Sequence, residues 1–313
     1  MDIKCNLILD SCCDLPHDIV DRKGVYLVQF PYFDDDGEHL DDLYQMQTAH
    51  DFYEGMRKGS EPHTAQVPMP ALQEAYQWAI DQGKPTVYLS FSSGLSGTFD
   101  TAQMLLDQMK AEHPDLELYL VDTKLASVAE ALLVYEALDQ REKGLTAKEL
   151  VTWAEEARYF VDAQFMVDDL EALRRGGRIP STVAFAGSKL DVKPLLGIDM
   201  NGKLALTGVA RGRKKGVKSL IDYWTKRRTN EGPVQNVVVG GADCPKDQER
   251  LVSLLAKEDE TAIVLESSIG PVIGSHVGPG MLAVVFWGPD KRNDLSVLIV
   301  LPAKFVANNI DGN

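Results

Sequence analysis

The sequence predicts an α/β protein of two domains, and three observations favour this class. Short apolar runs alternate with amphipathic helical patterns through residues 1–160, which is typical of a doubly wound, mostly parallel sheet with helices on both faces. Residues 161–313 contain a strong hairpin signal among their helices, which predicts an α+β domain with a mixed sheet. A length of 313 residues with 44% apolar content is enough for two hydrophobic cores.

The N-terminal α/β domain, residues 1–160, is predicted from strand-like runs that end at polar or turn residues. Strands are expected at 4–9, 25–33, 38–40, 86–91 and 117–121, and helices at 70–81, 96–110 and 126–143. Asp35-Asp36-Gly37 is a turn signal, so residues 25–40 are predicted to form a hairpin that protrudes from this domain. Thr146 followed by Glu149 predicts a capping box at the start of one more helix.

The C-terminal α/β domain, residues 161–313, is organised around Asn201-Gly202, the strongest hairpin turn signal in the chain. Strands are expected on either side of this turn, at 192–199 and 203–211. The remaining expected elements are helices at 168–174, 213–228 and 245–257 and strands at 234–239, 261–266, 281–287 and 295–300. Because a hairpin lies among strands that are joined by helices, the sheet is predicted to be mixed.

Charge is the most extreme bulk property of the chain. The formal net charge is −15, and a field of this sign repels phosphate, which excludes a general binder of nucleic acid or of anionic membranes. The charge is uneven, because residues 1–160 carry −17 whereas residues 161–313 carry +2. Within the second half, the segment 174–228 carries +11. This local excess indicates that the two halves have different roles.

Membrane and export signals are not evident in the sequence. No apolar run reaches the roughly 18 residues that a membrane span needs, and the N-terminus enters a strand-like run without the apolar core of a secretion signal. The four cysteines form no CxxC pair, and the neighbouring Cys12 and Cys13 are interpreted as reduced thiols. A cytoplasmic location is therefore expected.

Several common site motifs are missing. The chain has no Walker P-loop and no GxGxxG after a strand, so no nucleotide cofactor is predicted. The six histidines show no HExxH spacing, and no metal site is expected. A GxSxG nucleophile elbow is also missing, since Ser96 lies in Gly94-Leu95-Ser96-Gly97, one residue short of that pattern. No catalytic residue is therefore assigned.

The segment 91–98 is the most informative polar motif. It lies at the end of a predicted strand and opens a predicted helix, where unpaired N–H groups and a partial positive charge suit a carboxylate or a phosphate. The alternative is ordinary helix capping by Ser93 or Ser96. Capping needs one hydroxyl, and the motif supplies four, which favours anion binding.

Three more residues are candidates, each with an ordinary structural alternative. Thr64 lies in a polar loop between two helices and could equally be a turn residue. Arg178 follows Gly176-Gly177; guanidinium groups suit anions, and the alternative is compensation of a helix dipole. His276 lies in a Gly/Pro-rich loop, 269–280, whose glycines permit close approach of a ligand, although a lone loop histidine is usually exposed or satisfied.

Six segments together resemble the DegV family in order and spacing, from residue 4 to about residue 300. They are Asp10-Ser11 to Asp14-Leu15-Pro16, Thr64 to Gln66, 92–98, Gly176-Gly177-Arg178-Ile179, Lys193-Pro194 and 269–280. The family includes the fatty-acid-binding subunits of bacterial fatty acid kinases. One departure is Thr64-Ala65-Gln66, where the family commonly has Thr-Ser-Gln.

The resemblance implies a DegV-like fold, in which the N-terminal domain sends a hairpin, here 25–40, to the sheet of the second domain. It implies a long-chain fatty acid bound between the domains, with its carboxylate near Thr64 and near Ser92 or Ser93. Arg178 and His276 are expected at the head group or at the partner surface. The residues expected to support the loops are Gly94, Ser96, Gly97, Thr98 and Gly278.

The function implied is that of a carrier rather than an enzyme. The protein would need no cofactor and would present the carboxylate to a separate ATP-dependent fatty acid kinase, which makes an acyl phosphate. Nucleic acid is not expected as a partner, and transient contact with a membrane stays open. One alternative is a stand-alone hydrolase of acyl esters or acyl phosphates, with a serine of 92–98 and His276. Another is a regulatory binding module that docks through the basic segment 174–228.

Overall fold

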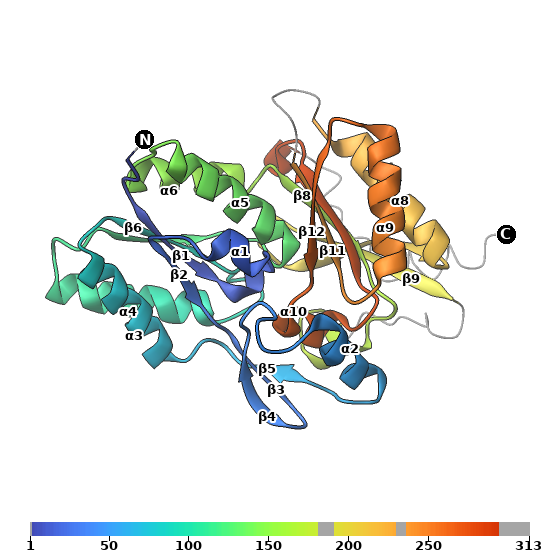
Figure 1. The fold of residues 1–313 in the computed structure, drawn as a ribbon, viewed down its shortest axis with the longest axis horizontal. Helices are drawn as coiled ribbons and strands as arrows, with labels where there is room; N and C mark the ends of the chain where they lie inside the picture. The colour runs from blue at the N-terminus through green and yellow to red at the C-terminus, as the bar shows by residue number, and fades with distance from the viewer. Residues whose placement is uncertain (1, 181–190, 230–235, 294–313) are drawn as a thin grey trace.

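Two large β-sheets organise the chain, one in each half, and a small third sheet lies beside them (Figure 1). The computed structural model describes residues 2–180, 191–229 and 236–293. The α/β class predicted from the sequence is confirmed, with one parallel sheet and one mixed sheet. In the described part of the chain, no helix is both long enough and apolar enough to cross a membrane.

The first sheet is parallel throughout and has the order β2-β1-β6-β7. Its strands are β1 (Asn6–Asp10), β2 (Val25–Val28), β6 (Thr86–Ser90) and β7 (Leu118–Asp122). One pair of helices covers each face (Figure 1). These pairs are α3 (Met69–Gln82) with α4 (Thr98–Glu112), and α5 (Val128–Glu142) with α6 (Ala147–Ala157). The doubly wound arrangement and the capping box of Thr146 and Glu149 are as predicted.

The prediction of a hairpin over residues 25–40 is wrong in two respects. The chain leaves the first sheet after β2, and the hairpin itself consists of β3 (Pro31–Asp34) and β4 (Gly37–Leu40). It pairs with β5 (His63–Thr64) as a separate three-stranded sheet and makes no ladder with the sheet of the second half. The break has a local cause, because the Phe30 amide donates to Ser11 Oγ (3.1 Å) and Pro31 has no amide hydrogen to continue a ladder.

The second sheet is mixed and has the order β10-β9-β8-β13-β11-β12, with a single parallel pair, β11 and β12, among its described strands. The strands are β8 (Val161–Met166), β9 (Val192–Ile198), β10 (Leu204–Arg211), β11 (Asn236–Gly241), β12 (Ile263–Ser268) and β13 (Leu282–Trp287). The hairpin across Asn201-Gly202 is confirmed, with Leu204 opposite Ile198. The strand expected at 295–300 lies outside the described residues.

Helix α5 lies between the two large sheets. It packs with α6 in the first half and also contacts β8, β11 and β13 of the second sheet. On the other face of that sheet lie α8 (Arg213–Arg227) and α9 (Pro245–Glu258), both close to their expected bounds. The larger hydrophobic cluster therefore runs through both halves, and the smaller one lies under α8 and α9. The domain boundary near residue 160 stays a prediction; β8, the first strand of the second sheet, begins at Val161.

Several short elements were not expected. They are the 3-10 turn η1 (Ser11–Cys13), α1 (His17–Val20), α2 (Ala49–Arg57), α10 (Pro271–Val277) and the 3-10 turn η3 (Lys291–Asn293). The short helix expected at 168–174 is α7 (Glu171–Arg175). The loop expected at 269–280 is corrected, because α10 occupies most of it. Pro271 is suited to the first turn of a helix, and the positive φ of 74° at Gly278 ends it.

Candidate functional site

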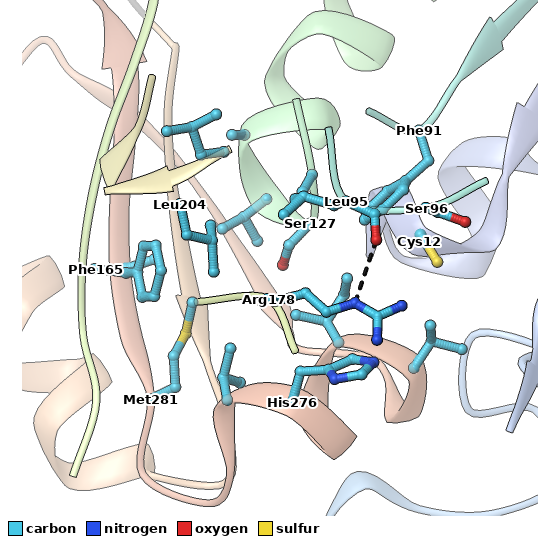
Figure 2. Close-up of a pocket in the computed structure, with 18 of the residues that line it drawn as sticks. Cys12, Phe91, Leu95, Ser96, Ser127, Phe165, Arg178, Leu204, His276 and Met281 are labelled. Atoms are coloured by element: carbon cyan, nitrogen blue, oxygen red, sulfur yellow. Dashed lines mark hydrogen bonds between the residues drawn. The ribbon is translucent and has the colours of Figure 1, made fainter. Parts of the chain in front are cut away.

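A narrow, mostly apolar cavity lies between the two halves of the molecule (Figure 2). It contains about 760 Å³ of empty space, part of which opens to solvent. All the principal layers contribute to its wall: η1, the loop after β6, the start of α5, the second sheet and α10. Neither half alone encloses this space.

The second sheet forms one side of the cavity with small and large side chains in alternation. Ala163 of β8 is paired across the ladder with Val285 of β13, and Phe165 is paired with Ala283 in the same way. The two alanines leave room beside the larger side chains, and α10 adds Val272 to the apolar wall. Such a lining offers no hydrogen bond to a ligand, so this part of the cavity suits a hydrocarbon.

Polar groups gather at the end of the cavity where Thr64, Arg178 and His276 line it. Thr64 Oγ1 and His276 Nε2 lie 2.8 Å apart, which joins β5 of the first half to α10 of the second. His276 Nδ1 is buried and has no hydrogen-bond partner among the described residues. The ring packs on Gly176, where a Cβ would overlap Nδ1, so a glycine at this position makes room for the histidine.

His276 is neutral at physiological pH. Burial lowers its pKa to about 4, and the positive charges of Arg178 and Arg175 act in the same direction. A neutral imidazole can donate from one nitrogen and accept at the other. Nε2 of this ring is engaged with Thr64, and the unpaired Nδ1 lies against Gly176.

Arg178 is a half-buried cation with no acidic partner in the described ranges 2–180, 191–229 and 236–293. Its Nε donates to the Leu95 carbonyl (3.2 Å) and its Nη1 donates to the Gly176 carbonyl, so two backbone groups fix the guanidinium beside His276 (Figure 2). Burial lowers the pKa of Arg178 from 12.5, yet the group stays charged at neutral pH. A desolvated cation without a counter-ion favours an anionic ligand.

The structure places Ser92 and Ser93 outside the cavity lining, unlike Thr64, Arg178 and His276. The buried Ser92 hydroxyl donates to the Gly202 carbonyl (2.9 Å) and accepts from the Gly94 amide (3.1 Å). The Ser93 hydroxyl accepts from Lys124 Nζ at 2.8 Å. Both hydroxyls therefore fix the loop after β6, and the geometry does not favour the predicted carboxylate contact for either.

The rest of the 92–98 loop is held by contacts with neighbouring groups, and the alternative of capping by Ser93 or Ser96 is not observed, because the N-cap of α4 is Gly97 and no side chain caps it. Ser96 lines the cavity, but its Oγ accepts from the Thr98 amide and lies 3.0 Å from Thr98 Oγ1. A Cβ at Gly94 would overlap the backbone of Gly202, and one at Gly97 would overlap the side chain of Gln66. These glycines allow close chain approach, and Gly278 ends α10.

Ser127 and Cys12 are cavity residues that the sequence motifs did not single out. Ser127 precedes α5 with a positive φ of 56°, and its hydroxyl donates to the buried carboxyl of Asp14. The helix predicted at 126–143 includes Ser127, whereas α5 begins at Val128 and has Ser127 as its N-cap residue. Cys12 is a free thiol like the other three cysteines, and burial raises its pKa well above 9.0, so it is unreactive.

The geometry does not support a stand-alone hydrolase. Ser96 pairs with Thr98, and His276 pairs with Thr64 instead of with a serine. His276 Nδ1 also lacks a carboxylate to orient it in the described part of the chain. One group of potential metal ligands, His50, Glu54 and Asp243, lies at the surface, and there Arg57 already bonds to both carboxylates.

The model of the family described as "Uncharacterised protein, DegV family" matches residues 4–288. The chain belongs to the DegV family. A DegV domain-containing protein of Clostridium perfringens is 35% identical over 91% of this chain and 98% of its own length. A "Fatty acid-binding protein" of Thermotoga maritima is 29% identical over 89% of this DegV chain and 96% of its own length.

Solved structures of DegV proteins have the same fold as this chain. A fatty-acid-binding DegV protein of Thermus thermophilus superposes with a TM-score of 0.79 at 26% identity, over 91% of this chain and all of the other. A Streptococcus agalactiae protein described as a fatty acid binding DegV family protein gives a TM-score of 0.79 at 26% identity, over 92% and 100%. Fatty acid binding is thus a property of DegV family members, and the predicted membership is confirmed.

Proposed function

We propose that this DegV protein binds a long-chain fatty acid in the cavity between its halves. The observation that carries the proposal is Arg178, a cation at the polar end of an apolar cavity that has no counter-ion within the described part of the chain. A carboxylate supplies the missing negative charge, and a hydrocarbon chain fills the apolar remainder. The names of related DegV proteins, which describe fatty acid binding, support the same assignment.

The cavity provides enough apolar contact for tight binding. Burial of an acyl chain contributes about 0.8 kcal/mol per CH₂, so a sixteen-carbon chain gains roughly 10 kcal/mol before the costs of ordering. At the polar end, Arg178 supplies the charge. Thr64 and the neutral His276 share one hydrogen bond through Nε2, so the pair offers a carboxylate one hydrogen, that of the Thr64 hydroxyl when Nε2 donates or that of Nδ1 when Thr64 donates. In this assignment the carboxylate contacts are Thr64, Arg178 and His276, and Ser92 and Ser93 are support for the loop.

The bound carboxylate is then presented to a separate, ATP-dependent fatty acid kinase that forms the acyl phosphate. Two features of the sequence support a carrier without its own phosphoryl transfer: no nucleotide-binding fingerprint, and the charge of +11 over 174–228, which suits an acidic partner surface. The location proposed for this exchange is the cytoplasm. Because Thr64 belongs to the first half and Arg178 and His276 belong to the second, this assignment would hold the head group where the two halves meet.

The proposal is tested with Arg178→Met, which keeps the length of the side chain but removes the charge. We expect the dissociation constant for palmitate to rise by about tenfold to a hundredfold, because hydrogen bonds to charged groups contribute about 1.5–3 kcal/mol. Calorimetric titration of delipidated protein measures this. The matched control is Arg174→Met in the same segment, since Arg174 pairs with Glu171 at the surface and does not line the cavity.

Two results would contradict the proposal. One is wild-type protein that carries no fatty acid in native mass spectrometry and takes up none on titration. The other is an equal effect of the Arg178 and Arg174 substitutions. The kinase step has its own readout, because a purified ATP-dependent fatty acid kinase should form acyl phosphate from the loaded protein and not from free fatty acid at the same concentration.

A further inference from the structure

One buried peptide group, between Ile269 and Gly270, is held by three side chains of the other half of the chain. The Ile269 carbonyl oxygen accepts hydrogen bonds from Tyr44 Oη (2.7 Å) and from Tyr53 Oη (2.8 Å). The Gly270 amide of the same peptide group donates to Asp14 Oδ1 (2.9 Å). Ile269, Tyr53 and Asp14 are all buried. We call Asp14, Tyr44 and Tyr53 the peptide clamp.

The clamped peptide is the one from which α10 begins. Gly270 is the N-cap residue and has no side chain to cap the helix, and Pro271 follows without an amide hydrogen. A helix of seven residues is too short to be stable by itself, since isolated helices below about 12 residues are marginal in water. The direction of α10 is therefore set by contacts from outside the helix.

The other end of α10 carries His276. There the helix is joined to Thr64 by the 2.8 Å contact with Nε2, and it lies against Tyr53 at Gly274, where a Cβ would come within 2.6 Å of Tyr53 Oη. The clamp fixes one end of α10 and so determines where His276 lies relative to Thr64 and Arg178. A shift of about 1 Å in such a group is enough to weaken its interactions strongly.

We infer that Asp14, Tyr44 and Tyr53 are positioning residues for the carboxylate site: by holding the Ile269–Gly270 peptide they keep His276 in place for a fatty acid head group. This inference rests on the proposed function. None of the three needs to touch the ligand, and neither tyrosine lines the cavity. Their effect on binding is exerted through α10 and is directed at the head group, not at the hydrocarbon wall.

The test compares an acid with the matching alcohol. The double variant Tyr44→Phe/Tyr53→Phe removes both donors to Ile269 and keeps the rings. We expect dodecanoate to bind at least tenfold more weakly to the delipidated variant, while the affinity for dodecanol changes less than twofold, as measured by calorimetric titration. A general loss of structure would weaken both ligands together, so the ratio of the two dissociation constants isolates positioning from stability.

Two further variants serve as controls. Asp14→Asn keeps an acceptor for the Gly270 amide, and because burial and the neighbouring Asp41 raise the pKa of Asp14 well above 3.8, the neutral amide is a close mimic. Asp14→Asn should retain the wild-type ratio of dodecanoate affinity to dodecanol affinity, whereas Asp14→Leu should lower this ratio. Tyr76→Phe is the matched control, because Tyr76 is equally buried and donates to the Ala102 carbonyl (3.0 Å) between α3 and α4.

The inference is overturned if the double variant keeps the wild-type ratio of acid to alcohol affinity, or if both affinities fall together. If the double variant does not fold, Tyr44→Phe alone should still lower the ratio about threefold, and an unchanged ratio again counts against the clamp. Failure of the proposed function looks different, because then the wild-type protein itself shows no preference for dodecanoate over dodecanol.

Discussion

At the scale of single residues, the polar end of the cavity combines a charged donor with a neutral imidazole. Arg178 stays cationic, while burial and the nearby arginines lower the pKa of His276 to about 4. Near neutral pH, Arg178 is therefore charged and His276 is uncharged. In the proposed assignment, an anionic head group would meet the full positive charge of Arg178 beside the Thr64–His276 pair, and this charge favours a carboxylate over a neutral lipid head group.

Asp41 provides a pH-dependent test of the buried polar network near η1. Its Oδ1 accepts from the Leu43 amide, its Oδ2 has no partner among the described residues, and burial raises its pKa from 3.8 to about 7. Such a group contributes full stability below pH 3.8 and loses that contribution as the pH rises through 7. Asp41→Asn should therefore gain free energy of unfolding relative to the wild type between pH 4 and pH 7, by up to about 4 kcal/mol.

Denaturant titrations of both proteins at pH 4, 5.5 and 7.5 measure this difference. Comparing variant with wild type cancels groups that do not interact with Asp41, such as His276, whose lowered pKa acts in the opposite direction between about pH 6.5 and pH 4. Asp14 is not cancelled, because the charge of Asp41 contributes to its raised pKa. A difference that stays constant over this range would show that Asp41 is not held in a desolvated site.

At the scale of elements, the contact between α7 and α10 depends on a single glycine at the end of α7. Gly176, the C-cap of α7, has φ −70°, so alanine fits its backbone, but a Cβ there would overlap His276 Nδ1. The glycine is therefore required by its neighbour on α10 and not by its own conformation. Because the packing is this close, one methyl group added at Gly176 would displace His276.

Gly176→Ala should displace His276 and weaken palmitate binding by about tenfold, which corresponds to roughly 1.4 kcal/mol. Calorimetric titration of delipidated protein measures the change. The matched control is Gly55→Ala in α2, where a new Cβ meets nothing within 4 Å and the helix should gain about 0.5–1 kcal/mol. Unchanged binding in the Gly176 variant would mean that His276 does not contribute to the head-group site.

The elements themselves differ in how well the sequence predicts them. Helices α8 and α9 and the β9–β10 hairpin follow from apolar spacing, a proline near a helix start and Asn201-Gly202, all of which act within a few residues. Helix α10 was missed because three glycines and two prolines within 269–279 are typical of a loop. It is helical because Asp14, Tyr44 and Tyr53 hold its first peptide from another part of the chain.

At the scale of the whole molecule, α5 joins the two sheets and the cavity lies beside its first turn. The larger hydrophobic cluster extends through both halves, so the buried side chains on the two sides of α5 belong to one core. The small sheet β4-β3-β5 contributes Thr64 of the first half to the polar end of the cavity, where Arg178 and His276 belong to the second half. A ligand in this cavity would therefore stabilise the arrangement of the two halves.

Ala283→Leu tests whether the cavity holds the acyl chain. The added side chain fills empty space, so the delipidated variant should be at least as stable as the wild type, while palmitate should bind at least tenfold more weakly. Ala131→Leu in α5 is the control, because Ala131 is fully buried, does not line the cavity, and overpacking there should cost about 1–3 kcal/mol. Thermal unfolding and titration with palmitate give both quantities; retained binding in the Ala283 variant would place the acyl chain elsewhere.

The site was only partly predictable, for a reason that its residues illustrate. Arg178 was a candidate because guanidinium groups suit anions, and the DegV resemblance implied head-group roles for Thr64 and His276; the structure brings these three to the lining of one cavity. Ser92 and Ser93 satisfied the same criteria, yet their hydroxyls bond to Gly202 and Lys124 from other segments. Residue type shows which contacts a side chain can make, whereas packing determines which partner it has.

The sequence by itself determined the class of the fold and the strands and helices with clear apolar spacing, because periodicity, capping and turn signals act between residues that are close in the chain. The DegV family was indicated separately, by the resemblance of six motifs in their order and spacing. Only the tertiary structure decided that the hairpin stays outside the second sheet, that α10 is a helix, and that Arg178 lacks an acidic partner in the described chain. These depend on contacts between segments far apart in sequence, whose geometry is set by the packing of two halves around one cavity.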